Sequence, residues 1–170
     1  MNEELGAISV CYAVHFGRRS KHSPERLWRA ISEPAQVAAW MGYPARIDLR
    51  PGGEFTIDFD STNPGDVLDG VIVRVEPRRR LQYVWGSSVV DWVIEPDVIG
   101  SSYTFAQSGL ALRDVPDEEG LAAGWHDFLE SLDGYLDGRP RDAAAGRHRW
   151  EQLKPRYRAL LSSAVGSALK

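Results

Sequence analysis

The stretch LAAGWHDFLESLDGYLDG, residues 121–138, decides the fold class of this chain. Its apolar residues recur every three or four positions, which is the period of an α-helix. They form one stripe on that helix: Leu121, Trp125, Phe128, Leu129, Leu132, Tyr135 and Leu136. A helix over residues 121–137 is about 25 Å long. Because so wide a stripe must pack against another apolar surface, the remainder of the chain is expected to supply that surface.

The residues before this helix alternate between apolar and polar side chains in several short runs. The runs lie at 8–16, 45–59, 67–77, 81–86, 89–95 and 101–108. Alternation with a period of two predicts strands that have one buried face, which is typical of antiparallel sheets. Pro51 with Gly52 and Gly53 favours a tight turn that splits the run at 45–59 into two strands. The sequence PRRR at 77–80 is expected to be another turn, exposed to solvent.

Two short helices are predicted between the first run and the second. Ser23 is a suitable N-cap, and Pro24 suits the first helical position. Pro34 interrupts this helix and begins another, which Gly42 ends. The predicted order is one strand, two short helices, about six antiparallel strands and one long helix. This order indicates an α+β fold in which the long helix covers a curved sheet.

Phasing each strand by its largest apolar residues places one set of side chains toward the long helix. The set is Phe55, Ile57, Phe59, Leu81, Tyr83, Trp85, Val90, Trp92, Ile94, Tyr103 and Phe105, with Gln107 in the same phase. A core built only for packing favours Leu, Ile and Val, because a buried indole N–H or phenol O–H needs a partner. Two interpretations remain open: a solid core whose polar tips are bonded internally, and a cavity that holds a ligand.

Five motifs in this order resemble a known family. They are SPERLWRAISEPAQVAAWMG, IDLRPGGEFTIDF, GVIVRVEPRRRLQYVWG, YTFAQSGL and GWHDFLESLDGYL. Together they resemble the activator-of-heat-shock-protein-90-ATPase-like branch of the START (SRPBCC) superfamily, over about residues 10–138. The resemblance implies a helix-grip fold with a deep cavity between the sheet and the long helix. Family members often carry a histidine where this chain has Gln107, and an amide can only donate and accept hydrogen bonds.

The resemblance favours the cavity over the solid core. The residues expected to bind a ligand there are Trp40, Phe55, Ile57, Phe59, Tyr83, Trp85, Trp92, Tyr103, Phe105, Gln107, Trp125, Phe128 and Leu129. Gln107 and the tyrosine hydroxyls would orient the polar groups of an apolar, aromatic or polycyclic small molecule. The four histidines fall in four different segments, so no metal ligand, cofactor or catalytic residue is predicted. His126 is expected in water, on the flank of the long helix.

Three classes of function remain open. The favoured one is a non-enzymatic protein that binds such a small molecule. The superfamily includes proteins that protect producers of reactive natural products, so natural-product biosynthesis or antibiotic self-resistance is one setting, with sequestration of an enediyne-type metabolite as its specific form. The alternatives are a polyketide cyclase- or aromatase-like enzyme that uses the same cavity, and a co-chaperone-type protein-interaction module. Fold resemblance does not choose among them.

The composition limits the classes of binding partner and the cellular compartment that we expect. The net charge of −4 predicts no general attraction to nucleic acid or to anionic membranes. No apolar run approaches the roughly 20 residues that a membrane-spanning helix needs. The first residues carry acids before their apolar positions, which is a poor signal-peptide pattern. With a single cysteine, Cys11, the chain forms no internal disulfide, and a cytoplasmic protein is expected.

A helix-grip domain over residues 1–138 and a basic helical extension over residues 139–170 are predicted. The extension contains eight Lys or Arg and two acidic residues, a net charge of +6, so the domain carries −10. Its apolar residues have helical spacing: Trp150, Leu153, Tyr157, Leu160, Leu161, Val165 and Leu169. Pro155 is expected to kink this helix or to begin a new one. Packing on the acidic domain is favoured; a homodimer contact, a chaperone contact and a lid over the cavity remain open.

Overall fold

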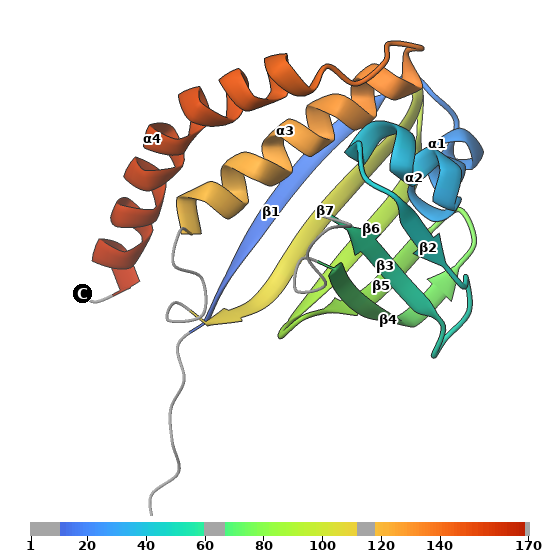
Figure 1. Ribbon diagram of the computed structural model, residues 1–170, viewed down its shortest axis with the longest axis horizontal. Helices are drawn as coiled ribbons and strands as arrows, with labels where there is room; N and C mark the ends of the chain where they lie inside the picture. The colour runs from blue at the N-terminus through green and yellow to red at the C-terminus, as the bar shows by residue number, and fades with distance from the viewer. Residues whose placement is uncertain (1–10, 60–66, 112–117, 169–170) are drawn as a thin grey trace, which may run out of the picture.

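The computed structural model describes residues 11–59, 67–111 and 118–168 (Figure 1). Its elements are β1 (Cys11–Ser20), α1 (Pro24–Ser32), α2 (Pro34–Met41), β2 (Ala45–Ile47), β3 (Glu54–Asp58), β4 (Val67–Glu76), β5 (Arg80–Trp85), β6 (Ser88–Asp97), β7 (Gly100–Ala111), α3 (Glu118–Leu136) and α4 (Ala143–Ala168). The predicted order of one strand, two short helices, six strands and a long helix is confirmed. Within these residues, no helix combines the length and the apolar character needed to cross a membrane.

The strands form one antiparallel sheet in the order β1-β7-β6-β5-β4-β3-β2. Strands β2 to β6 each pair with the next strand in sequence, and β1 joins the sheet beside β7. Figure 1 shows the sheet curling around α3, with α1 and α2 beside α3 and α4 along its outer side. The predicted α+β, helix-grip architecture is therefore confirmed.

Capping residues set the ends of the two short helices as the sequence predicts. Ser23 Oγ accepts a hydrogen bond from the Arg26 backbone N–H at 3.2 Å, and Pro24 is the first residue of α1. Gly42 ends α2 in the left-handed conformation, with φ of 82°. Glycine adopts this conformation at little cost, because it has no Cβ. The Trp40 indole N–H donates to the Ala30 carbonyl at 2.8 Å. Thus α2 satisfies one of the last carbonyls of α1, which have no partner within their own helix.

Several strands differ from their predicted extents; β6 ends at Asp97 instead of residue 95, and β7 at Ala111 instead of residue 108. β1 continues to Ser20, beyond the predicted end at residue 16, because it stays paired with β7 as far as Ser101; residues 8–10 of that prediction lie outside the described residues. β2 has only three residues, since the chain turns before β3. A Cβ at Gly53 would overlap the carbonyl oxygen of Asp48, so this turn requires glycine at that position.

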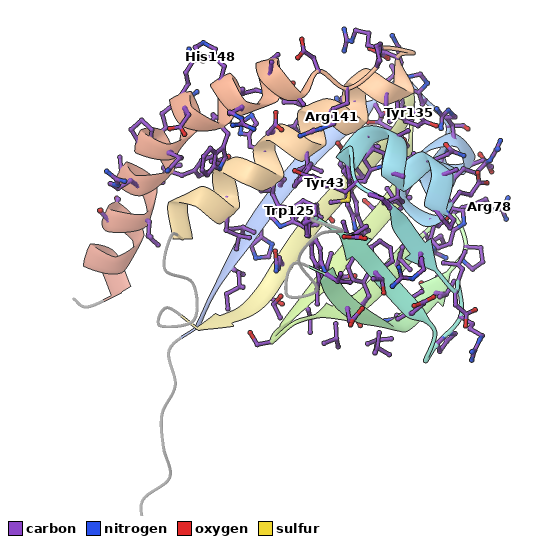
Figure 2. The ribbon with its side chains drawn as sticks, in the orientation of Figure 1. Tyr43, Arg78, Trp125, Tyr135, Arg141 and His148 are labelled. Carbon is purple, nitrogen blue, oxygen red and sulfur yellow. The ribbon has the colours of Figure 1, made fainter. Side chains whose placement is uncertain are left out.

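The basic extension is anchored on α3 by Asp127. This carboxylate is 5% exposed, and it accepts hydrogen bonds from Arg141 at 3.0 Å and from Arg149 at 2.9 and 2.7 Å. Gly146 packs directly on it, since a Cβ there would lie 2.9 Å from Asp127 Oδ2. Figure 2 shows Arg141 reaching α3 from the connection that leads into α4. The extension therefore packs on the domain by a buried charge as well as by apolar contact.

The remainder of α4 contacts α3 with its apolar side. Trp150 donates its indole N–H to the Gly120 carbonyl at 3.0 Å, and Leu153 is buried. Leu160, which belongs to the same predicted stripe, is 63% exposed. The helix is continuous from Ala143 to Ala168 with Pro155 inside it, so the prediction of a second helix beginning at that proline is wrong.

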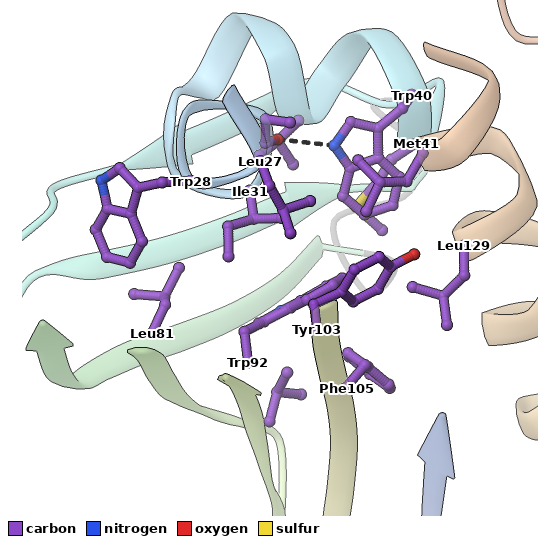
Figure 3. Packing of buried hydrophobic residues seen from close by; sticks show 14 of the residues in the cluster. Leu27, Trp28, Ile31, Trp40, Met41, Leu81, Trp92, Tyr103, Phe105 and Leu129 are labelled. Atoms are coloured by element: carbon purple, nitrogen blue, oxygen red, sulfur yellow. Dashed lines mark hydrogen bonds between the residues drawn. The ribbon is translucent and has the colours of Figure 1, made fainter. Parts of the chain in front are cut away.

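Aromatic rings fill the centre of the layer between the sheet and the helices. Figure 3 shows Trp92 beneath Leu27, Ile31 and Trp40, beside Tyr103 and Phe105. Its ring centroid lies 4.8 Å from that of Phe105. The rings of Phe55 and Tyr83 stack nearly parallel at 3.9 Å. The predicted inward phase of the strands is confirmed, because every member of the set is buried except Phe59, which is partly buried.

Candidate ligand-binding site

A pocket of about 220 Å³ lies between the sheet and the N-terminal half of α3. Phe59 follows the last residue of β3, Trp85 ends β5, and β7 supplies Gln107. The helix supplies the rest of the lining: Gly120, Leu121, Gly124, Trp125 and Phe128. Four of the eight lining residues are aromatic, and Trp85 and Trp125 meet edge to face at a centroid distance of 5.5 Å. The pocket is therefore a narrow space between aromatic side chains.

The thirteen candidate residues divide into two groups. Five line the pocket: Phe59, Trp85, Gln107, Trp125 and Phe128. The other eight pack in the core, each at most 3% exposed: Trp40, Phe55, Ile57, Tyr83, Trp92, Tyr103, Phe105 and Leu129. They do not reach the pocket because they contact one another directly, as Phe55 and Tyr83 do.

Sequence reasoning missed three residues that line the pocket: Leu121, which it placed on the helical stripe only, and the glycines Gly120 and Gly124. Gly124 lies one helical turn before Phe128. A Cβ at Gly124 would meet no atom within 4 Å, so the space beside it is open. A glycine on the inward side of an otherwise good helix is a signal for such a space, because glycine costs about 1 kcal/mol relative to alanine in a helix.

Gln107 is the polar centre of the site, and its inward direction is confirmed. Its side-chain oxygen accepts the Trp125 indole N–H at 2.6 Å. Its side-chain nitrogen donates to Ser88 Oγ at 2.7 Å, and Ser88 Oγ donates to the Trp85 carbonyl at 2.7 Å. An amide offers two donors and two acceptor sites. Among the described residues, each end of Gln107 therefore has one hydrogen bond, and its amide has the capacity for one more at each end.

The indole N–H of Trp85 is a buried donor without a partner. Within the described part of the chain, only it and Asp58 Oδ1 are buried side-chain polar atoms that lack a hydrogen bond. The indoles of Trp40, Trp92, Trp125 and Trp150 all donate to the protein. An orphaned buried donor costs about 1–3 kcal/mol. A ligand oxygen that reached Trp85 would remove that cost.

The tyrosine hydroxyls do not orient a ligand in this pocket. The Tyr103 hydroxyl donates to Asp133 at 2.9 Å, and the Tyr83 hydroxyl accepts the Trp92 indole N–H at 3.5 Å. Burial raises the pKa of both phenols well above its usual range, and the Asp133 carboxylate raises that of Tyr103 further. Both are thus neutral groups of the core. Among the described residues, no group of three or more His, Cys, Asp or Glu is arranged to hold a metal ion.

The sequence-based expectation that His126 lies in water is wrong. The residue is half-buried under α4. Its ring Nδ1 lies 2.8 Å from the Tyr157 hydroxyl, and its ring meets that of Phe16 edge to face at 6.0 Å. Burial lowers the pKa of His126, and the charge of Arg18 lowers it further. Arg149 and Arg156 act in the same direction, while Glu130 opposes them.

This environment predicts an acid-sensitive contact between α3 and α4. Because its folded-state pKa is depressed, His126 binds a proton more readily in the unfolded chain. Stability is then lost as the pH falls below about 6.5, the ordinary histidine pKa. We expect the free energy of unfolding, measured with urea at a series of pH values from neutral to mildly acidic, to fall more in the wild type than in His126→Gln. Parallel curves would contradict this.

Comparison with known proteins places these features in a wider context. Residues 21–137 match the model of the family described as activator of Hsp90 ATPase homolog 1-like protein. No curated protein matches the chain significantly. Protein MLL2253 from Mesorhizobium loti is 29% identical, with a TM-score of 0.66, and the match covers 74% of this chain and 97% of that one.

Two further solved structures share the fold at lower identity. CalU16 from Micromonospora echinospora is 21% identical, with a TM-score of 0.69 and 87% of each chain covered. EF2215 from Enterococcus faecalis is 16% identical, with a TM-score of 0.71, and the match covers 90% of this chain and 85% of that one. Residues 1–138 are 138 of 170, about 81% of the chain, so both matches must include part of the extension.

Proposed function

Because this chain belongs to the activator of Hsp90 ATPase homolog 1-like family, and its helix-grip fold leaves an aromatic pocket under α3, we propose that it binds a small apolar aromatic molecule there. The pocket itself carries the proposal. Half of its eight lining residues carry an indole or benzene ring, and the Gln107 amide is the polar side chain among them. An apolar lining with a few placed polar groups is the usual composition of a small-molecule site.

The pocket size defines the ligand more narrowly than the sequence does. The volume is about 220 Å³. Common ligand sites begin at roughly 300 Å³. One ring or two fused rings therefore suit this pocket better than a larger polycyclic molecule. Burying ~200 Å² of apolar ligand surface contributes about 5 kcal/mol before association costs. That energy alone corresponds to a dissociation constant of about 0.2 mM, and the association costs make binding weaker than this.

Calorimetric titration with phenol, indole and 2-naphthol tests this proposal. We expect 2-naphthol to bind most tightly, because it fills the pocket and brings a hydroxyl to Gln107. Leu121→Trp adds a further ring to the pocket lining and should abolish binding. The matched control is Leu160→Trp, which adds the same ring at an exposed position of α4. The proposal is wrong if Leu121→Trp binds the compounds as the wild type does. It is also wrong if the wild type binds none of the three.

A binding role is favoured over an enzymatic one by the lining of the pocket. None of the eight lining residues is a His, Cys, Lys, Asp or Glu. Those are the side chains that most often act as acid, base or nucleophile. A polyketide cyclase-like reaction would then depend on positioning alone. Product analysis after incubation with a linear aromatic polyketide distinguishes the two roles, since a binding protein returns its ligand unchanged.

The proposal extends to a biological setting. We propose that the protein acts in natural-product biosynthesis or self-resistance, where it would sequester an aromatic metabolite. The ring-lined pocket is what supports this. Expression in a sensitive bacterial host should raise the tolerated concentration of an aromatic natural product that binds the purified protein. The Leu121→Trp variant at the same expression level should give no protection; equal protection by both would refute this setting.

A further inference from the structure

A second pocket, of about 730 Å³, lies between α2, α3 and α4. Its wall includes Tyr43 and Phe128 from the domain, and Arg141, Arg147 and Trp150 from the extension. Figure 2 shows Tyr43 and Arg141 where α2 approaches α3. Because the extension forms one side of it, this helix-lined pocket exists only while α4 is docked.

The two pockets share a wall. Gly124 and Phe128 line both the helix-lined pocket and the aromatic pocket. They are four residues apart, so they lie on the same side of α3. Apart from its chain neighbours and the backbone of its own helix, a Cβ at Gly124 would meet no atom within 4 Å, so the space beside Gly124 is open. The aromatic pocket and the helix-lined pocket therefore adjoin on this side of α3.

The helix-lined pocket carries an excess of positive charge. Asp127 supplies one negative charge, which Arg141 and Arg149 share. Arg147 also lines the pocket, is exposed, and forms no ion pair with any residue that the structure describes. Arginine binds carboxylates through two parallel hydrogen bonds. A cationic, partly aromatic pocket of this kind favours the anionic end of a ligand.

We infer that the natural ligand is an amphipathic anion, an aromatic carboxylate whose ring lies in the aromatic pocket and whose carboxylate is bound by Arg147 and Arg141. This inference rests on the proposed function and adds the charge of the ligand. The domain as a whole is acidic and repels anions. The basic extension thus reverses the local charge where the helix-lined pocket adjoins the aromatic pocket.

A matched pair of probes tests the charge alone: 1-naphthylacetate and its neutral analogue 1-naphthylacetamide, which have nearly the same shape. We expect the acid to bind the wild type roughly tenfold more tightly, the strength of one charge-assisted hydrogen bond. Raising the NaCl concentration about tenfold should weaken binding of the acid and leave the amide unchanged, since salt screens exposed charges. Titration calorimetry on the full chain measures both.

Substitutions then test which arginine binds the carboxylate of the probe. Arg147→Gln should bring the dissociation constant of the acid to that of the amide without changing the amide. Arg156→Gln removes the same charge from an exposed position of α4 outside the pocket, and should change neither. Leu121→Trp should abolish binding of both probes if one molecule spans both pockets.

The outcomes separate this inference from the proposed function. If the amide binds and the acid binds no better, the inference is wrong and the proposed function stands. If neither probe binds, both fail. An acid that still binds to Leu121→Trp would occupy the helix-lined pocket alone, which would overturn the spanning arrangement. Loss of the preference for the acid in Arg156→Gln as well as in Arg147→Gln would show a general charge effect instead of a site.

Discussion

Asp127→Ala is expected to lower the free energy of unfolding by about 3–5 kcal/mol and to release α4 from α3, since removing one partner of a buried ion pair leaves the other charges unpaired. The Arg141 side chain is 14% exposed, so its guanidinium would lose its carboxylate partner while staying largely out of water. Urea denaturation measures the stability. Limited proteolysis within residues 143–168 measures the release of the helix.

Two further variants make this result specific. Glu54→Ala removes a carboxylate from an exposed pair with Arg46 at 3.8 Å, and should change the stability little. Gly146→Ala keeps every charge but pushes a methyl group against the Asp127 carboxylate, so it should also destabilise the docked helix. If Asp127→Ala is no less stable than Glu54→Ala, α4 is held by its apolar contacts and the ion triad is incidental.

Gln107→Leu is expected to lower the free energy of unfolding by about 1–3 kcal/mol, the cost of leaving a buried donor unsatisfied. The substitution keeps the size of the side chain but removes the acceptor of the Trp125 indole N–H and the donor to Ser88. The sequence predicts that Gln107 orients a ligand. The two bonds predict in addition that Gln107 supports the fold, and the loss of stability measures that second role.

A double-mutant cycle checks the cause of this loss. Trp125→Phe removes the indole N–H, so adding it to Gln107→Leu leaves no orphaned donor at that position. The double variant should be more stable than the sum of the two single effects predicts. The control is Gln82→Leu, a glutamine of β5 outside the pocket, which should be nearly neutral. Strict additivity would mean that the Trp125–Gln107 bond contributes nothing.

The sequence predicts the fold well because its signals are local. The helical stripe of α3 follows from a period near 3.6, and the inward set of the strands follows from a period of two. Ser23, Pro24 and Gly42 set helix ends through their own dihedral angles and hydrogen bonds. None of these inferences requires knowledge of which distant residues meet.

The site is less predictable because it depends on contacts across strands. Phe55 and Tyr83 belong to β3 and β5, which are separated by β4, yet their rings stack at 3.9 Å. Gly70 of β4 pairs with Phe55, and it carries no side chain that would keep the two rings apart. Alternation gives the face on which a ring lies, but not which rings touch. The sequence therefore identifies the aromatic face without separating the pocket from the core.

The burial of Asp127 is equally non-local. Its place two residues after Trp125 gives no sign that it is buried, because its partners, Arg141 and Arg149, lie beyond the end of α3. The positive charge of residues 139–170 indicates attraction to the domain. It does not indicate that one carboxylate receives two arginines.

This anchoring by one carboxylate concentrates the docking of α4 at a single position. Asp127 receives both Arg141 and Arg149, so one substitution there disrupts both ion pairs at once. Because residues 140–150 form one side of the helix-lined pocket, the same substitution would open that pocket to solvent. Selection that retains this pocket therefore also retains the aspartate at position 127.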